Sequence, residues 1–173
     1  MTVLDLTQFI AHHPDFPQQG ILFYDIGPLL KDPNALHQMI SQLANAFSST
    51  EYDAVCGIDS RGFIFGSLLA FHVKKPFFMV RKPGKLPGQT VQTSYDMEYG
   101  KNSLQIQAAS VTPGEKILII DDVLATGNTA KSTVMLIEQL GGIVVGLGFV
   151  LELNALKGRD VLKNYNLQTM IHL

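Results

Sequence analysis

The stretch that decides the fold is Lys116-Ile-Leu-Ile-Ile-Asp-Asp-Val-Leu-Ala-Thr-Gly-Asn-Thr-Ala130. Its residues 117–120 form a continuous apolar run, which is typical of a strand covered on both faces in a parallel sheet. Asp121 and Asp122 follow directly, so we expect them at the carboxyl edge where open α/β sheets bind ligands. The small residues after them predict a tight turn into a helix.

This turn offers the groups that hold a phosphate dianion. Two hydroxyls, a glycine and backbone N–H groups meet at the helix start, where anions are favoured, in Ala125, Thr126, Gly127, Asn128 and Thr129. No lysine follows the glycine, so the stretch is not the nucleoside-triphosphate loop G-x-x-x-x-G-K-[ST]. Adjacent carboxylates can accept both hydroxyl hydrogens of a ribose diol. The stretch therefore predicts a site for a phosphorylated sugar, and the alternative is an ordinary strand end and helix cap.

The composition favours one globular domain. The chain has 173 residues, of which 46% are hydrophobic and 16% charged, with a formal net charge of −2. A chain of this size can bury a substantial core, and its charge gives no global field that would attract nucleic acid or an anionic membrane. No apolar run approaches the ~20 residues of a membrane span, so we expect a cytoplasmic protein. The histidines lack metal-ligand spacing, and Cys56 is expected in the core.

Strands and helices alternate along most of the chain. Apolar runs predict strands at residues 54–58, 76–80, 104–106, 117–120 and 143–151, and helical spacing predicts helices at 33–47, 62–71 and 127–140. This order predicts an α/β fold with a doubly wound, mainly parallel sheet. Residues 82–102 are rich in glycine and show no sustained period, so we expect a long mobile loop that acts as a lid.

A second cluster is suited to an anionic leaving group. Asp59, Ser60 and Arg61 follow one predicted strand and precede a helix, so they face the same edge as the acidic pair. Further cations follow the next strand, namely Arg81, Lys82 and Lys85. A pyrophosphate requires several converging donors. Taken alone, these cations are more typical of a solvated basic loop than of a ligand site, because lysine and arginine are normally exposed.

Six segments, which together extend over nearly the whole chain, carry a resemblance to a known family. They are the opening stretch and Pro14-Asp-Phe-Pro-Gln-Gln-Gly-Ile-Leu-Phe-Tyr-Asp-Ile26, Gly57-Ile-Asp-Ser-Arg-Gly-Phe63, Arg81-Lys-Pro-Gly-Lys-Leu-Pro-Gly88, Ser94-Tyr-Asp-Met-Glu-Tyr-Gly100 and Glu152-Leu-Asn-Ala-Leu-Lys-Gly-Arg159. In these segments the chain resembles the type I phosphoribosyltransferases, and among them the members that use adenine.

The resemblance implies a reaction and a set of contacts. Adenine and phosphoribosyl pyrophosphate would be the substrates, with Mg²⁺ bound mainly through the pyrophosphate donor. Residues at about 1–33 would form a hood over the base site, and a cis peptide would join Asp59 to Ser60. The pyrophosphate would contact the second cluster and the lid, at Asp59, Ser60, Arg61, Arg81, Lys82, Lys85 and Tyr99. Family members commonly form homodimers, so we expect one here.

The resemblance also implies how the base is held. Phe23 would stack on adenine, while the backbone of Leu22 would read the base edge through a donor and an acceptor. Glu98 in the lid would assist as acid or base, because N9 of adenine must lose its proton as the glycosidic bond forms. Tyr24 departs from the family pattern, where arginine would link the hood to the lid glutamate. This departure bears on base selectivity, and a phenol carries no charge at neutral pH.

Two alternatives follow from these features. The first is a phosphoribosyltransferase that acts on another purine base, which the departure at Tyr24 suggests. The second is a regulatory protein of the same fold that senses the donor and controls transcription or RNA. A regulator of that kind needs a DNA-binding domain or a basic RNA-binding face, whereas this chain is short and slightly acidic.

Overall fold

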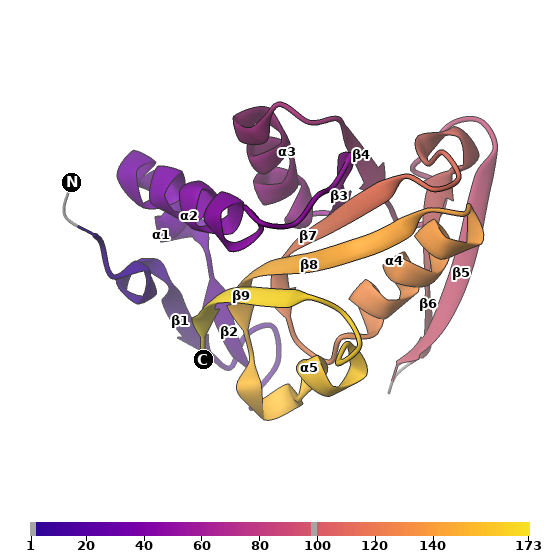
Figure 1. Cartoon of the computed structure of the whole chain (residues 1–173). Coiled ribbons are helices and arrows are strands. Elements are labelled where there is room, and N and C mark those ends of the chain that lie inside the picture. Colours follow the sequence, from indigo (N-terminus) through magenta and orange to yellow (C-terminus); the bar gives the residue numbers. More distant parts are fainter. Residues whose placement is uncertain (1–2, 98–99) are drawn as a thin grey trace.

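Five parallel strands form the central sheet of the protein in the computed structural model, which describes residues 3–97 and 100–173 (Figure 1). In spatial order they are β4 (Phe77–Val80), β3 (Ala54–Ile58), β7 (Lys116–Leu124), β8 (Ile143–Glu152) and β9 (Leu167–His172). All neighbouring pairs are parallel. The chain runs outward from β3 to β4 and then returns to the other side of β3 at β7. The expected doubly wound sheet is thus confirmed, and its direction of winding reverses between β3 and β7.

Helices cover both faces of this sheet, as expected from right-handed crossovers between parallel strands. On one face lie α2 (Pro33–Ala46) and α3 (Gly62–Val73), and on the other lies α4 (Asn128–Gln139). Asp32 caps α2, because its Oδ1 accepts hydrogen bonds from the N–H groups of Asn34 and Ala35, both at 2.9 Å. The helices expected at residues 33–47, 62–71 and 127–140 are confirmed, with small differences at their ends.

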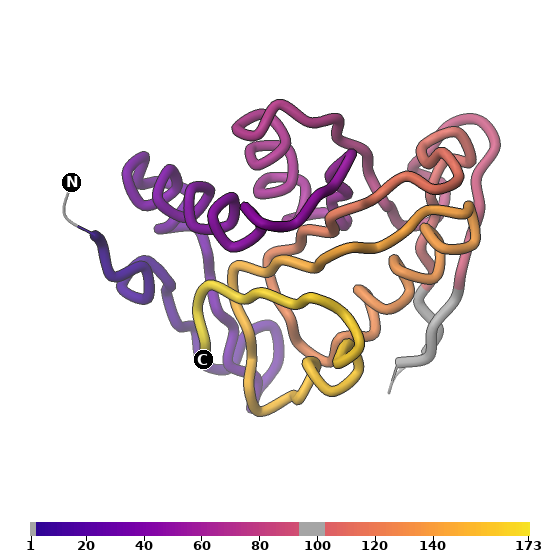
Figure 2. Tube along the Cα trace, viewed as in Figure 1, coloured from indigo at the N-terminus to yellow at the C-terminus, as the bar shows by residue number. Residues whose placement is uncertain are grey.

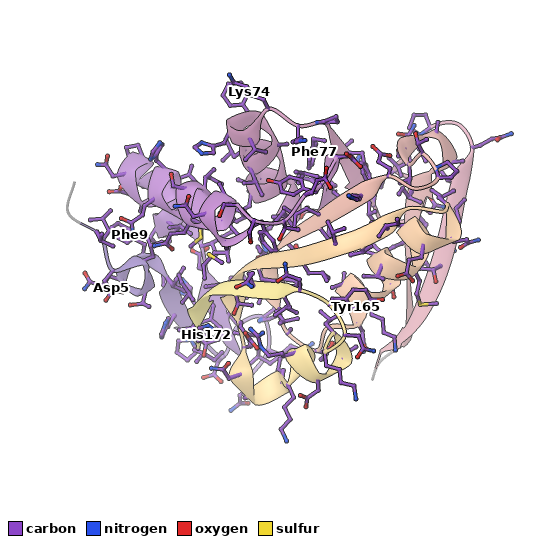
Figure 3. All side chains as sticks on the ribbon, in the orientation of Figure 1. Asp5, Phe9, Lys74, Phe77, Tyr165 and His172 are labelled. Carbon is purple, nitrogen blue, oxygen red and sulfur yellow. The ribbon has the colours of Figure 1, made fainter. Side chains whose placement is uncertain are left out.

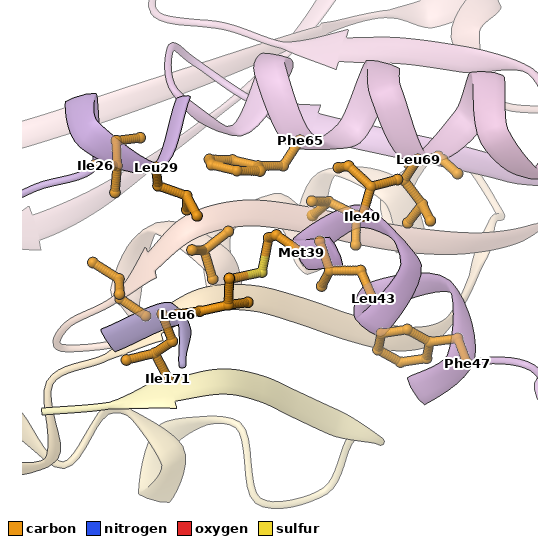
Figure 4. Close-up of a cluster of buried hydrophobic side chains, with 14 of the residues drawn as sticks. Leu6, Ile26, Leu29, Met39, Ile40, Leu43, Phe47, Phe65, Leu69 and Ile171 are labelled. Carbon is orange, nitrogen blue, oxygen red and sulfur yellow. The ribbon is translucent and has the colours of Figure 1, made fainter. Parts of the chain in front are cut away.

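The two faces bury separate hydrophobic clusters. Alternate side chains of a strand point to opposite faces, so Leu118 and Ile120 pack beneath α2 and α3, while Ile117 and Ile119 face α4. Figure 4 shows Met39 and Leu43 of α2 in the first cluster, together with side chains of α3. Cys56 is fully buried in the second cluster, which confirms its expected place in the core.

Residues 3–31 form a small N-terminal unit, here called the hood, that packs on the end of this core. It consists of η1 (Leu6–Phe9), the antiparallel pair β1 (Ala11–Pro14) and β2 (Leu22–Asp25), and α1 (Gly27–Lys31). Leu6, Ile10 and Ile26 belong to the same buried cluster as Ile171 of β9. In Figure 1 the hood strands therefore lie beside the carboxyl end of the sheet.

Most of the expected lid is an antiparallel pair of strands. β5 (Thr90–Met97) pairs with β6 (Gly100–Gln107) in continuous register, so the expectation of an irregular loop over 82–102 is wrong for the residues in these strands. The strand expected at 104–106 is confirmed within β6. Residues 98 and 99, which separate the two strands in the sequence, lie outside the described part and fall within the stretch that Figure 2 draws in grey. Action of this hairpin as a lid stays a prediction.

Short elements complete the chain. They are η2 (Ala108–Ser110), η3 (Asn154–Leu156) and α5 (Gly158–Val161), and α5 lies between β8 and β9. Figure 3 places Tyr165 in the connection after α5 and His172 at the end of β9. Among the helices of residues 3–97 and 100–173, none has the length and apolar character needed to cross a membrane.

Candidate active site

A cavity of about 310 Å³ lies at the carboxyl ends of β3 and β7. This is the point where the strand order reverses, which is where open α/β sheets place their ligands. Its lining comes from the segment after β3, the segment after β4, the end of β7 with the turn that follows, and one residue of β8. The lining residues are Asp59, Ser60, Arg61, Lys82, Asp121, Asp122, Val123, Leu124, Ala125, Thr126, Gly127, Thr129, Ala130 and Phe149.

The acidic pair stands on the floor of the cavity. Asp121 and Asp122 are both buried and lie within β7, which extends beyond them to Leu124. The expectation that the strand ends before the pair is therefore wrong, because Asp121 still pairs with Phe149 of β8. The strand thereby fixes both carboxylates on a rigid element rather than on a loop.

Arg61 balances the charge of this pair. Its Nε lies 2.7 Å from Oδ2 of Asp122, while Oδ1 of Asp121 accepts a hydrogen bond of 2.9 Å from the Asp122 N–H. Burial raises the pKa of Asp121, and the charge of Asp122 raises it further. Burial also raises the pKa of Asp122, but the Arg61 guanidinium opposes that shift. Asp122 is thus the member of the pair that holds a negative charge more readily.

The turn between β7 and α4 forms the second wall. Gly127 has φ +81°, a left-handed conformation that glycine adopts without strain, and it lets the chain enter α4 at Asn128. The first N–H groups of a helix have no partner within the helix, and the turn directs this end toward the cavity that Ala125, Thr126 and Thr129 line. The arrangement provides an anion site beside two carboxylates.

Asp59 organises the wall after β3. The Asp59–Ser60 peptide is cis, as expected. Oδ2 of Asp59 lies 3.1 Å from Nε of Arg81 and also accepts from the Lys82 N–H at 3.4 Å. Arg81 in turn donates through Nη1 to the Lys85 carbonyl oxygen at 3.3 Å, and its guanidinium lies 5.5 Å from the centre of the Phe63 ring. The anionic group at Asp59 therefore holds the basic segment 81–85 beside the cavity.

The hood contributes one aromatic contact to this region. The guanidinium carbon of Arg61 lies 5.5 Å from the centre of the Phe23 ring, and Phe16 packs edge-on against the same ring at 5.2 Å. Tyr24 packs its ring edge-on against His12 across the β1–β2 pair, at 5.0 Å. Arg61 thus contacts both a carboxylate of the sheet and an aromatic ring of the hood.

The structure brings most of the predicted site residues together. Of those predicted, ten line the cavity, namely Asp59, Ser60, Arg61, Lys82, Asp121, Asp122, Ala125, Thr126, Gly127 and Thr129. Others contact or adjoin lining residues without lining it, namely Phe23, Arg81, Lys85 and Asn128. Leu22 precedes Phe23 in β2 and does not line the cavity. Glu98 and Tyr99 fall outside the described residues. Sequence reasoning missed the apolar lining residues Val123, Leu124, Ala130 and Phe149, because apolar side chains near a strand end do not differ from core positions.

Comparison with known proteins agrees with this geometry. The phosphoribosyl transferase domain family matches residues 27–172. An adenine phosphoribosyltransferase of Halothermothrix orenii is 45% identical over 97% of this chain and 99% of its own length, and one of Pseudothermotoga lettingae is 47% identical over the same shares.

Solved structures lead to the same family. Adenine phosphoribosyltransferase from Thermoanaerobacter pseudethanolicus has a TM-score of 0.95 at 41% identity, covering 98% of both chains. The Saccharomyces cerevisiae enzyme, solved with an imino-altritol bisphosphate and adenine, has a TM-score of 0.90 at 37% identity, covering 96% of both chains. The chain therefore belongs to the phosphoribosyltransferase family, among the adenine phosphoribosyltransferases.

Proposed function

We propose that this protein transfers the 5-phosphoribosyl group from phosphoribosyl pyrophosphate to N9 of adenine, giving AMP and pyrophosphate in a purine-salvage reaction. The observation that carries the proposal is the cavity in which two buried carboxylates stand beside the start of α4. The relatives named as adenine phosphoribosyltransferases, and the yeast enzyme solved with adenine, support adenine as the acceptor.

The donor's ribose 5-phosphate is assigned to the floor and the second wall. Residues 125–129 take the phosphate dianion through backbone N–H groups and the hydroxyls of Thr126 and Thr129. Asp121 and Asp122 accept hydrogen bonds from the two ribose hydroxyls. To free Asp122 for the ribose, the Arg61 guanidinium shifts from Asp122 toward the incoming pyrophosphate, which carries more negative charge than a single carboxylate.

Pyrophosphate is assigned to the wall after β3. Asp59 and Ser60 supply backbone groups there, while Arg61 and Lys82 line the cavity and bring positive charge. Arg81, Lys85 and Tyr99 approach from the segment after β4 and from the hairpin. Several cations around one leaving group stabilise the charge that develops on pyrophosphate as its bond to ribose C1 breaks.

The residues present fit a magnesium ion that the donor itself brings. Mg²⁺ prefers oxygen ligands and keeps several waters, and the cavity has three carboxylates in its lining, those of Asp59, Asp121 and Asp122. Among the described residues no group of three His, Cys, Asp or Glu side chains is arranged to hold a metal. Oxygens of the donor and water would therefore supply most of its ligands, and Asp121 or Asp122 would hold the ribose hydroxyls or waters beside it. When bound, the ion would offset the negative charge of the pyrophosphate.

The base is assigned to the hood. Phe23 stacks on adenine, and the Leu22 backbone, in β2, offers its N–H and C=O to the N1 and N6 edge. As the C1–N9 bond forms, the bond from C1 to pyrophosphate breaks and N9 loses its proton. Glu98 is the carboxylate proposed to receive that proton or to stabilise the positive character at C1.

An assay with four bases tests the reaction. Purified protein, phosphoribosyl pyrophosphate and Mg²⁺ are combined with adenine, hypoxanthine, guanine or xanthine, and nucleotide formation is followed. We expect AMP from adenine and at most a trace of product from the 6-oxo purines, because their edge presents the opposite donor and acceptor pattern. Turnover confined to a 6-oxo purine would overturn the assignment of the base.

The assembly and the location are further parts of this proposal. We expect a homodimer, in keeping with the family, so the mass measured by light scattering after gel filtration should be twice the 19.0 kDa of one chain. A mass equal to one chain at assay concentrations would contradict it. We also expect the protein in the cytoplasm, because its highly charged donor does not cross a bilayer unaided. Cell fractionation checks this point.

A further inference from the structure

An ion-pair cluster around one buried carboxylate lies at the carboxyl end of β8, outside the cavity. Glu152 is only 5% exposed, and its two carboxylate oxygens accept hydrogen bonds from Nε and Nη2 of Arg159 at 3.0 and 2.6 Å. Thr169 of β9 donates a third, at 2.7 Å, and Nδ1 of His172 lies 3.4 Å away. The hydrogen bonds from Arg159 and the burial of the carboxylate act in opposite directions, and the former prevail to lower the pKa of Glu152.

The cluster fixes α5 to the edge of the sheet. Arg159 lies in α5, a helix of a single turn, and a helix this short depends on contacts with the rest of the fold. A bidentate arginine–carboxylate pair holds its two members in one relative orientation. Together with Thr169 and His172, Glu152 therefore ties α5 to both β8 and β9, and Figure 3 shows His172 at that end of β9.

The residue before Arg159 touches the proposed phosphate loop directly. A Cβ added at Gly158 would collide with the Ala125 carbonyl oxygen and lie 3.0 Å from the Gly127 nitrogen. Conversely, a Cβ at Gly127 would lie 2.7 Å from the Gly158 carbonyl oxygen and 3.2 Å from Cβ of Val161. Two glycines thus let the backbone of α5 and the backbone of the loop pack against each other without side chains between them.

A hydrogen bond on the same side strengthens this contact. The Leu153 N–H, which follows Glu152, donates to the Leu124 carbonyl oxygen at 2.9 Å, immediately before the loop. Both ends of the segment 152–159 are therefore connected to the loop region. The first end donates a backbone hydrogen bond to the residue before the loop, and the second packs against the loop through the paired glycines. Figure 1 shows α5 beside the beginning of α4.

We propose that Glu152 and Arg159 are positioning residues for the 5-phosphate, which act by pressing Gly158 against the loop 125–129. Backbone N–H groups hold an anion well only when they are already arranged before it binds. The ion pair holds α5, and through Gly158 it fixes the loop on the side away from the substrate. Neither side chain contacts the substrate. The inference rests on the proposed assignment of residues 125–129 to the phosphate.

A pair of ligands isolates the effect. AMP and adenosine share the base and the ribose and differ in the phosphate, so calorimetry with both separates phosphate binding from the rest of the site. For Glu152→Gln, which leaves Arg159 and Thr169 facing an amide nitrogen, we expect AMP to bind about tenfold more weakly. Adenosine affinity should stay as in the unaltered protein. In kinetics, KM for phosphoribosyl pyrophosphate should rise while KM for adenine does not.

Two further variants serve as a control and as an independent test of the ion pair. Glu51→Gln is the matched control, because Glu51 is an exposed carboxylate paired with Lys116 at the opposite end of β7; it should leave both affinities unchanged. Arg159→Lys keeps the charge but loses the bidentate fork, and it should weaken AMP alone by about threefold or more. If Glu152→Gln does not fold, as judged by circular dichroism, Arg159→Lys decides the question.

The outcomes distinguish a failure of the loop assignment from a failure of the role of the ion pair. Thr126→Ala alters the loop itself and should reduce AMP affinity about threefold with adenosine unchanged. If Thr126→Ala leaves the AMP to adenosine ratio unaltered, the loop assignment fails and the inference fails with it. If Thr126→Ala lowers the ratio but folded Glu152→Gln and Arg159→Lys keep it, only the role of the ion pair is overturned. Equal losses of AMP and adenosine affinity in the ion-pair variants would indicate a general structural role and also overturn it.

Discussion

Asp121 is a carboxylate in a buried position that is unfavourable for its ionised form. Burial and the charge of Asp122 raise its pKa, so the ionised form destabilises the native state. A group whose pKa is raised on folding contributes its stability at low pH and loses it as the pH rises through the folded-state pKa. The stability of the protein at neutral pH is therefore lowered by this residue.

Asp121→Asn should consequently increase the free energy of unfolding but lower the catalytic activity. Asparagine keeps an oxygen that can accept from the Asp122 N–H but carries no charge, so we expect the free energy of unfolding at neutral pH to increase by about 1 kcal/mol. The gain should vanish when the pH falls below the ordinary range of an aspartate. Because the ribose hydroxyl loses a charged acceptor, kcat/KM should fall by about tenfold or more. Urea unfolding at two pH values and initial rates check both effects; a destabilised variant would contradict the account.

Phe23, in strand β2 of the hood, is the residue proposed to stack on adenine. Its ring is half-buried, lies against Arg61 and Phe16 and faces the region next to the cavity. Stacking of a base on an aromatic ring contributes about 1 to 3 kcal/mol, so Phe23→Ala should raise KM for adenine about tenfold. KM for phosphoribosyl pyrophosphate should stay unchanged. Phe71→Ala, at a position 85% exposed on α3, is the control, and an equal effect there would remove Phe23 from the base site.

Glu98 lies outside the described residues, so its role is carried by the sequence motif alone. Glu98→Gln keeps the size of the side chain and removes its capacity to accept a proton. We expect kcat to fall by about a hundredfold, within the usual contribution of general acid–base catalysis, with donor affinity nearly intact. Single-turnover rates and donor binding by calorimetry check this. A rate equal to that of the unaltered enzyme would exclude Glu98 from the mechanism.

At the scale of elements, the contact between α3 and β7 fixes the site. Gly62 begins α3, and a Cβ there would lie 2.7 Å from Oδ1 of Asp121 and 2.9 Å from the Ile120 carbonyl oxygen. The absence of a side chain therefore lets the wall after β3 and the acidic pair approach each other closely. This contact links the two segments whose residues line the cavity.

Gly62→Ala should separate these elements. Because the obstructing atoms include backbone, α3 or β7 has to shift, and overpacking of this kind costs about 1 to 3 kcal/mol. We expect that loss in urea unfolding, together with a reduced kcat/KM. Ser67→Ala, at an exposed position of the same helix, should change neither quantity. Full activity and stability in Gly62→Ala would show that the close approach is not required.

The elements differ in how far the sequence determines them. Residues 54–58 were predicted at their observed bounds as β3, because a strand buried on both faces has only apolar side chains. Only residues 104–106 of the hairpin of β5 and β6 were predicted as a strand, because many of its other positions are polar and the segment 82–102 contains glycines and prolines that resemble loop signals. The pairing of β5 with β6 joins residues that are distant in the sequence, such as Thr93 and Leu104, so no local pattern contains it.

For the whole molecule, topology gathers the site from distant segments. The reversal of strand order brings residues 59–61 and 121–130 to one cavity, and this could be predicted because both follow apolar strands. The contact of the Phe23 ring with Arg61 could not be predicted, because the packing of the hood on Ile171 and its neighbours depends on tertiary contacts alone. The ion pair of Glu152 and Arg159 was likewise visible in the sequence only as part of a family motif.

Local charge, rather than net charge, suits the cavity to an anionic ligand. The chain carries −2 overall, yet Arg61 and Lys82 line the cavity and Arg81 is held beside it by Asp59. Fields focused in a cleft attract a charged ligand even when the total charge is slightly negative. The proposed pyrophosphate site therefore depends on a few placed cations.

A crystal structure of the protein with AMP tests the central claim most directly. The account predicts that the phosphate lies within hydrogen-bonding distance of backbone N–H groups of residues 126–129 and that the ribose hydroxyls contact Asp121 and Asp122. Phe23 should then stack on the adenine ring. A phosphate bound elsewhere, with the turn before α4 left without an anion, would contradict the account.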